Sequence, residues 1–412
     1  MMADPAGGAK WRVPWTLGVV ELVCWGTFYY AFAVFLPAMQ QDLGWSQAVL
    51  TSAYSLSMVV RGVAAIPVGQ LLDRHGARGL MIMGVGLGVV TLLGWARIDS
   101  YLVLYAVFVS MGLVTATVLY EPAFALVVRA FGERRDNALL VVTVIGGLAS
   151  TVFLPLTVTL VAGLGWRRAL LVLAAVLVVG AMLPLLALVR EPRSARPRTA
   201  DVRPANHMRM AVVIRHAIRS RPFLWLTIAS FLSYLTVVAV SVHLVSYLME
   251  RGYSAQTAAI AVGALGVLSV LGRVAVTGIA RRLRLARLTA ALVVCQAIAV
   301  VPLLALRDVT GLVLFVLLFG AGFGVLTIAR ASLLADYAPK QMYGRYAGLQ
   351  AFVVTMAQVV APAGGSVLRG WLGYPVVFIF CAVLSAAAAA ALLLADHTSR
   401  ADADTVADLG VR

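Results

Sequence analysis

Charged residues are scarce in this chain of 412 residues. Asp, Glu, Lys and Arg make up 12% of the sequence, whereas hydrophobic residues make up 62%. The mean hydropathy is +0.95, and soluble domains carry about 25% charged residues. The composition therefore excludes an ordinary soluble globular protein and predicts an integral membrane protein.

Acidic residues are scarcer than basic ones. The chain has 17 Asp and Glu against 33 Lys and Arg, which gives a formal net charge of +16. Nucleic-acid-binding domains also carry such an excess, but they gather it on one soluble face. Here the basic residues lie in short segments between apolar runs, which is typical of membrane topology. We expect no nucleic-acid partner.

The sequence also has few cysteines and lacks the nucleotide-binding motif of ATP-driven pumps. The three cysteines, Cys24, Cys295 and Cys381, lie inside apolar runs without the spacing of metal ligands, which favours small buried side chains. The motif G-x-x-x-x-G-K-[ST] is absent, so an ATP-driven pump is not expected. The glycines at 320–324 lie in an apolar run, where small residues allow close helix packing. We expect no enzyme, no catalytic residue, no metal and no cofactor.

Long apolar runs are what the chain has in abundance. A spanning helix needs about 20 apolar residues, and the runs are too long and too uniform for barrel strands. The first run follows Lys10 and Arg12 and has membrane length, which favours a retained helix over a cleaved signal peptide. We predict an all-α membrane protein with twelve transmembrane helices, near residues 15–38, 46–71, 79–97, 101–128, 138–162, 167–190, 222–249, 255–280, 287–306, 309–335, 344–368 and 373–395.

A polar segment divides these runs into two pseudo-symmetric six-helix halves. The predicted division is a first half at 1–190, a basic cytoplasmic linker at 191–221, a second half at 222–395 and a cytoplasmic tail at 396–412. The tail is polar, and we expect it to be disordered. The halves repeat weakly with an offset near 209 residues, which sets Glu121 against Arg330.

The distribution of Lys and Arg predicts the orientation. If the N-terminus is cytoplasmic, the segments on that side hold 24 basic residues and the opposite loops hold 6. An excess of basic residues marks the cytoplasmic side. We therefore expect a multi-pass plasma (inner) membrane protein with both termini in the cytoplasm, in contact with membrane lipid.

One charged turn between two apolar runs carries a specific pattern. It reads Gly69-Gln-Leu-Leu-Asp73-Arg74-His75-Gly76-Ala-Arg78 and resembles the loop 2–3 signature of the major facilitator superfamily, G-x-L-x-D-R-x-G-x-R, at every defined position. The resemblance implies the major facilitator fold, with a substrate path between two halves. We expect Asp73 to cap or pair locally. We assign a gating role to the motif and to the one charge in the preceding run: Gly69, Asp73, Arg74, Gly76, Arg78 and Arg61.

Four further patches resemble the monocarboxylate transporter and oxalate/formate antiporter branch of that superfamily. They lie at residues 30–32, 129–150, 165–167 and 272–278. In the last patch, Arg273 matches the anion-binding arginine of the branch.

Three positions depart from the branch. Val34 stands where animal-type carriers have a lysine, and Ser269 stands where they have an aspartate. Residues 351–367 contain no lysine, which argues against oxalate as the substrate. The resemblance thus carries anion binding over to Arg273, but not the aspartate-based proton handling.

Five charges lie within the apolar runs: Glu21, Arg61, Glu121, Arg273 and Arg330. A charge at the centre of a bilayer costs about 2.5–3.5 kcal/mol on the translocon insertion scale, so each should face the protein interior and have a partner. One interpretation is a structural or gating network of ion pairs. In the other, three arginines against two glutamates leave one positive charge for a substrate carboxylate, whose geometry suits the arginine fork.

The candidate site residues form two groups. For tyrosines and for histidine, packing is the alternative interpretation throughout. The substrate-binding candidates are Arg273, Tyr29, Tyr30, Tyr120, Arg330 and Tyr234. The candidates for proton coupling are the two helix-embedded carboxylates and one titratable histidine: Glu21, Glu121 and His243.

These patterns together predict a secondary active transporter. The expected substrate is a small organic anion, a monocarboxylate, moved by alternating access with proton symport or exchange. The alternative is a proton-driven multidrug or metabolite exporter of the same fold, which would tolerate loss of Arg273. A membrane receptor or enzyme is a second alternative, against which the lack of a soluble domain counts. We expect a monomer.

Overall fold

The computed structural model describes residues 5–190, 210–279, 283–306 and 308–410, and within these ranges the chain forms helices and no strand. Ten helical stretches of the described chain are long and apolar enough to cross a membrane. Two of them, Tyr101–Leu164 and Lys340–Ala401, contain 64 and 62 residues, whereas one crossing needs only about 20. The predicted all-α membrane protein is confirmed. Twelve crossings fit these lengths, and the count itself stays a prediction.

The chain divides into two compact units. The first comprises Met1–His207 with Lys340–Phe352, and the second comprises Met208–Pro339 with Val353–Arg412. The predicted boundaries of the two halves stay predictions. Residues 191–209 of the predicted linker lie outside the described residues, and α11 (Met210–Arg219) occupies most of the remainder.

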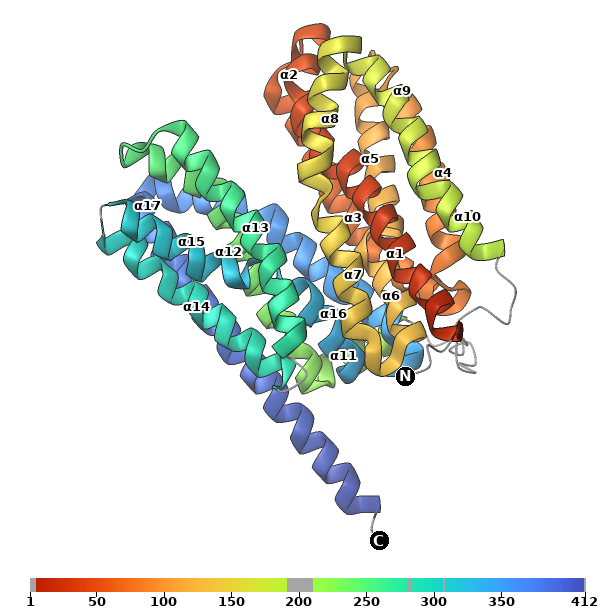
Figure 1. Ribbon diagram of the computed structural model, residues 1–412, viewed down its shortest axis with the longest axis vertical. Helices are drawn as coiled ribbons and strands as arrows, with labels where there is room; N and C mark the ends of the chain where they lie inside the picture. Colours follow the sequence, from red (N-terminus) through yellow and green to blue (C-terminus); the bar gives the residue numbers. More distant parts are fainter. Residues whose placement is uncertain (1–4, 191–209, 280–282, 307, 411–412) are drawn as a thin grey trace. The chain divides into compact units, whose positions relative to one another are not determined.

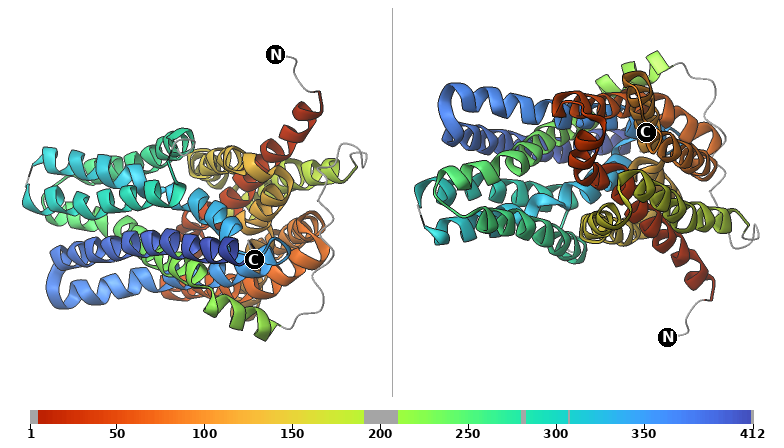
Figure 2. Two further views of the ribbon diagram at one scale, coloured as in Figure 1. Left: turned by 90° about the horizontal axis from the view of Figure 1, so that it is seen from below. Right: turned by 90° about the horizontal axis from the view of Figure 1, so that it is seen from above.

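The first unit is built from apolar helices that lie side by side (Figure 1, Figure 2). Within it, α1 packs along α7 and α3 packs along α5. Its helices are α1 (Pro5–Trp25), α2 (Ala31–Leu43), α3 (Gln47–His75), α4 (Ala77–Trp95), α5 (Tyr101–Val118), α6 (Tyr120–Phe131), α7 (Arg135–Gly147), α8 (Ala149–Leu164), α9 (Trp166–Leu177) and α10 (Leu183–Arg190).

In the second unit, α15 packs against both α13 and α14. Its further helices are α12 (Arg221–Glu250), α13 (Ala255–Ile279), α14 (Leu285–Ala305), α15 (Val309–Phe323) and α16 (Val325–Tyr337). The last helix, α17 (Tyr343–Gly410), begins in the first unit, and Gly373 interrupts it with a φ of 78°. Because α17 continues to Gly410, the expectation of a disordered tail is wrong for residues 396–410.

Three interruptions inside membrane helices position the candidate site. The turn η1 (Gly26–Tyr30) between α1 and α2 is π-helical, and a Cβ on Gly26 would lie 2.1 Å from the ring of Phe153. The backbone is extended at Leu119, between α5 and α6, and a turn at Gly324 separates α15 from α16. Pro122 explains the second interruption, because proline lacks the N–H donor and its ring clashes with the carbonyl group four residues earlier.

Candidate functional site

An arginine and a glutamate meet inside the first unit. Nη2 of Arg61 on α3 lies 3.8 Å from Oε2 of Glu121 on α6, and the two side chains are 8% and 12% exposed. The guanidinium of Arg61 also lies 5.3 Å from the ring centroid of Trp25, within the range of cation–π attraction. The two charges therefore partner each other, as charges inside membrane helices commonly do.

The interruption before α6 gives Glu121 a favourable place. Glu121 is in the first turn of α6, where the N–H groups of the helix terminus point outward and stabilise a negative charge. Paired half-helices of this kind place a helix terminus at membrane depth, where an ion or a charged substrate can be bound.

Aromatic side chains surround this ion pair. The ring centroid of Trp25 lies 5.2 Å from those of Tyr29 and Tyr120, and the Tyr29 and Tyr30 centroids are 5.1 Å apart. Tyr29 and Tyr30 belong to the π-helical turn η1, a rare geometry that is frequent at functional sites. Tyr29 is 38% exposed. The structure thus brings three predicted tyrosines into one aromatic group with Trp25, whose ring contacts Arg61.

Glu21 lies deeper in the same unit. Its side chain is fully buried, and within the described residues neither carboxyl oxygen has a hydrogen-bond partner. Gly146 on α7 packs against it, since a Cβ there would lie 3.1 Å from Cβ of Glu21 and 2.9 Å from the hydroxyl oxygen of Tyr120. An ionised carboxylate is costly in such surroundings, and a bound proton would remove that cost.

Arg330 and Tyr234 meet in the second unit. Arg330 on α16 is 5% exposed, and its guanidinium lies 6.0 Å from the ring centroid of Tyr234 on α12. The hydroxyl group of Tyr234 lies 3.4 Å from that of Thr327. Arg330 follows the interruption at Gly324, as Glu121 follows the one at Leu119. The two positions that the weak sequence repeat aligns therefore resemble each other in local structure.

Arg273 lies at that same interruption. Its Nε donates a hydrogen bond of 3.1 Å to the carbonyl oxygen of Gly324. A Cβ on Gly324 would lie 2.0 Å from the Ser269 hydroxyl oxygen and 2.5 Å from Nε of Arg273, so a side chain there would displace Ser269 and Arg273. Arg273 is half-buried, and its guanidinium is held at the junction of α15 and α16.

His243 is packed into the second unit. It is 5% exposed, and Nε2 lies 3.3 Å from the carbonyl oxygen of Pro362. A Cβ on Gly365 would lie 2.3 Å from Nε2. These contacts are those of a packing residue and do not connect His243 with Arg330 or Tyr234.

Asp73 forms several polar contacts, and its side chain is fully buried. Its carboxylate accepts hydrogen bonds from the backbone N–H groups of Gly344 and Arg345 at 2.8 and 3.0 Å, and from Nη2 of Arg129 at 2.6 Å. Gly344 and Arg345 belong to the first turn of α17, whose N–H groups have no partner within the helix. Asp73 therefore caps a helix that is distant in sequence, and the expected local role is wrong.

Two glycines allow α3 to approach α17 this closely. A Cβ on Gly69 would lie 2.2 Å from the carbonyl oxygen of Gly344, and a Cβ on Gly348 would lie 2.3 Å from that of Ala65. Any other residue at either position would force the backbones apart. The motif predicts Gly69, whereas Gly348 is found only in the structure.

Two arginines of this cluster were not among the predicted site residues. Arg345 is fully buried, with Nη1 3.8 Å from Oδ2 of Asp73. Arg129 binds both the carboxylate of Asp73 and, at 3.0 Å, the carbonyl oxygen of Leu72. A signal was present in the sequence, because Arg129 opens one of the branch patches and Gly344-Arg345 begins an apolar run.

The other motif residues lie around this cluster. Gly76 has a φ of +80° between α3 and α4, a conformation that glycine adopts without strain. Nη1 of Arg78 donates to the carbonyl oxygen of Leu188 at 3.4 Å, and Arg74 is exposed. Arg61 lies about 18 Å away along α3, at 1.5 Å per residue, and belongs with Glu121 instead.

Curated proteins similar to this chain include named transporters of monocarboxylates. Monocarboxylate transporter 13 of Bos taurus is 27% identical over 388 residues, which cover 89% of this chain and 84% of that protein. Monocarboxylate transporter 4 of Mus musculus is 24% identical over 400 residues, covering 91% and 80% of the two chains.

Solved structures share the fold at lower identity. The transporter FucP, described in an outward conformation, has a TM-score of 0.75 and 17% identity, and the match covers 94% of this chain and 99% of that one. The human organic anion transporter MFSD10 (TETRAN) has a TM-score of 0.70 and 16% identity over 95% and 100% of the chains. The family profile of the Major Facilitator Superfamily matches residues 22–362 and 294–409. The chain is therefore a membrane transporter that belongs to the major facilitator superfamily.

Proposed function

We propose that the protein carries a small organic anion, a monocarboxylate, across the membrane by alternating access, coupled to proton symport or to exchange. The observation that carries the proposal is the charge content of the apolar runs, which contain three arginines, Arg61, Arg273 and Arg330, and two glutamates, Glu21 and Glu121. This excess of positive charge favours an anionic substrate such as a carboxylate. The names of the monocarboxylate transporters that resemble the chain along most of its length support the same substrate class.

Arg273 and Arg330 are the proposed ligands of the carboxylate. The hydrogen bond from Arg273 to Gly324 orients its guanidinium, and a preorganised fork is what bidentate carboxylate binding requires. Arg330 lies beside the ring of Tyr234, which offers an apolar face to the substrate's carbon skeleton. In the first unit, Tyr29, Tyr30 and Tyr120 are proposed to contribute in the same way around Arg61.

Glu21 is the proposed proton site. Its burial and its lack of hydrogen bonds within the described residues distinguish it from Glu121, which has Arg61 as a partner. Glu21 and Tyr120 both pack against Gly146. Gaining or losing one proton at Glu21 would therefore change the charge close to Tyr120. Glu121 and His243 are the second and third proposals for this role. Within the motif around Asp73, the proposed role is switching between transport states.

A ligand screen tests the substrate class directly. The melting temperature of the purified protein would be measured with acetate, lactate and pyruvate, and with the corresponding uncharged amides. A ligand that binds the folded state raises its apparent stability, so the acids should raise the melting temperature and the amides should not. If no carboxylate has an effect while hydrophobic cations do, the proposal is wrong.

A second function has one observation in its favour. The aromatic group of Trp25, Tyr29, Tyr30 and Tyr120 suits amphipathic compounds as well as short acids, as expected of a proton-driven exporter of drugs or metabolites. The two functions differ in what they need from Arg273. Export of an apolar compound should survive Arg273→Gln, whereas carboxylate uptake should not.

We also propose that the protein lies in the plasma (inner) membrane with both termini in the cytoplasm, on the distribution of basic residues alone.

A further inference from the structure

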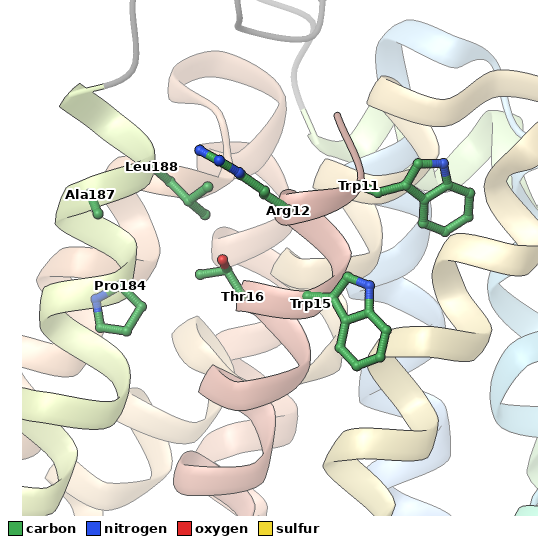
Figure 3. Close-up of a pocket in the computed structure, with 7 residues that line it drawn as sticks. All are labelled: Trp11, Arg12, Trp15, Thr16, Pro184, Ala187 and Leu188. Carbon is green, nitrogen blue, oxygen red and sulfur yellow. The ribbon is translucent and has the colours of Figure 1, made fainter. Parts of the chain in front are cut away.

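A groove in the first unit is lined by none of the residues assigned above to transport, although one lining residue, Leu188, accepts a hydrogen bond from Arg78 through its carbonyl oxygen. It has a volume of about 470 Å³, within the range of about 300–1,000 Å³ that is usual for small-molecule sites. Two helices form it, and Figure 3 shows the lining side chains. They are Trp11, Arg12, Trp15 and Thr16 from α1, and Pro184, Ala187 and Leu188 from α10.

The groove lies where the sequence changes from apolar to charged. Lys10 and Arg12 precede the first apolar run, and Arg190 ends another. Basic residues at the ends of apolar runs are typical of the cytoplasmic water boundary, so we expect one side of the groove to lie there and the other to continue along apolar helix surface. Tryptophan is enriched at this boundary because its ring is amphipathic. Trp15 is 58% exposed, and the ring centroid of Trp11 lies 5.5 Å from that of Phe131.

The polar and the aromatic lining residues of α1 lie on different sides of the helix. Arg12 and Thr16, four residues apart, extend toward α10, whereas Trp11 and Trp15 lie on the other side of α1 (Figure 3). The seven lining residues include one cation and no acidic side chain. Arg12 is exposed, so an anionic group can reach it. On α10, Pro184, Ala187 and Leu188 form an apolar wall.

We propose that this groove binds an acidic membrane phospholipid. The phosphate would contact Arg12, whose guanidinium forms charge-assisted hydrogen bonds with phosphate oxygens, and Thr16 would donate a hydrogen bond to the headgroup. One acyl chain would lie along Pro184, Ala187 and Leu188. A ligand with an anionic end and a long apolar end matches the groove, whereas a soluble anion would leave the apolar wall unused. The proposal does not depend on the transported substrate.

Lipid preference gives the first test. Native mass spectrometry would compare binding of dioleoyl phosphatidylglycerol with binding of dioleoyl phosphatidylcholine. One arginine at an anionic surface contributes about 1 kcal/mol, which corresponds to a preference of about fivefold. Arg12→Gln should lower the measured preference about fivefold, and Arg12→Lys should retain most of it. Arg219→Gln, which removes an exposed arginine on α11, is the matched control and should leave the preference unchanged.

The position of the lipid gives the second test, on the wild-type protein. Phosphatidylglycerol with a photoreactive diazirine in its acyl chain should label peptides that contain residues 11–16 or 184–188. Equal binding of the two lipids, an undiminished preference in Arg12→Gln, or labelling confined to other peptides would each overturn the proposal. The labelling experiment decides the question even if Arg12→Gln fails to fold.

Discussion

Replacing Asp73 with asparagine should release the start of α17 from α3. The carboxylate accepts three hydrogen bonds, from Gly344, Arg345 and Arg129, at 2.6 to 3.0 Å. Asparagine has nearly the same shape, but it is neutral and its NH₂ group can only donate. Because the groups around it are donors, at least one of the three bonds is lost and the others lose their charge assistance.

The size of the effect follows from burial. Removing one partner of a buried ion pair costs about 3–5 kcal/mol, and each 1.4 kcal/mol is a factor of ten in an equilibrium constant. Taking the lower value, about 3 kcal/mol, the equilibrium for separating α17 from Asp73 should shift on the order of 100-fold. A shift of this size traps a two-state transporter in one state, and it leaves binding unchanged for a ligand that has equal affinity for both states.

Hydrogen exchange measured by mass spectrometry reports this separation. The amides of Gly344 and Arg345 donate to Asp73, so in Asp73→Asn a peptide covering both should exchange on the order of 100-fold faster. Transport into proteoliposomes should slow, and equilibrium substrate affinity should stay within a few-fold. Asp99→Asn, which changes an exposed aspartate, is the control and should alter none of the three.

Two results would refute this reasoning. Unchanged exchange at Gly344 and Arg345 in Asp73→Asn would show that the carboxylate does not hold α17. A large loss of substrate affinity with a normal transport rate would place Asp73 in substrate binding instead of switching.

Three further predictions follow from other contacts. Gly69→Ala should slow transport as Asp73→Asn does, because its Cβ would lie 2.2 Å from the carbonyl oxygen of Gly344; normal transport in proteoliposomes would contradict this close approach. Arg273→Lys should recover only part of the carboxylate affinity that Arg273→Gln loses, because lysine lacks the two-pronged geometry; calorimetry on protein with a normal melting temperature measures this, and undiminished affinity would remove the assignment. Glu21→Gln should abolish substrate accumulation driven by an imposed pH gradient and leave exchange intact, whereas His243→Ala should retain accumulation; full accumulation in Glu21→Gln would move proton coupling elsewhere or favour exchange.

Several features of this protein follow from local sequence alone. Its membrane location and helical fold follow from the length of the apolar runs, because a bilayer leaves helices as the only structure available to such runs. The motif from Gly69 to Arg78 indicated the family without any knowledge of tertiary contacts. The charges of Glu21, Arg61 and Arg330 inside apolar runs marked them as interior residues, and all three are buried.

Partners could not be predicted, because they come from segments that are distant in sequence. Nothing in the motif indicates that Asp73 caps a helix beginning at Tyr343, or that Gly348 must be small to let α3 approach. Arg61 was grouped with the motif because the two are close in sequence. A distance of twelve residues along α3 separates Arg61 from Asp73. The tertiary packing instead places Arg61 beside Glu121. The sequence by itself identified Glu21, Arg61 and Arg330 as charges buried at a cost. Only the tertiary structure showed that Arg345 is buried as well, and which groups compensate the cost of burial.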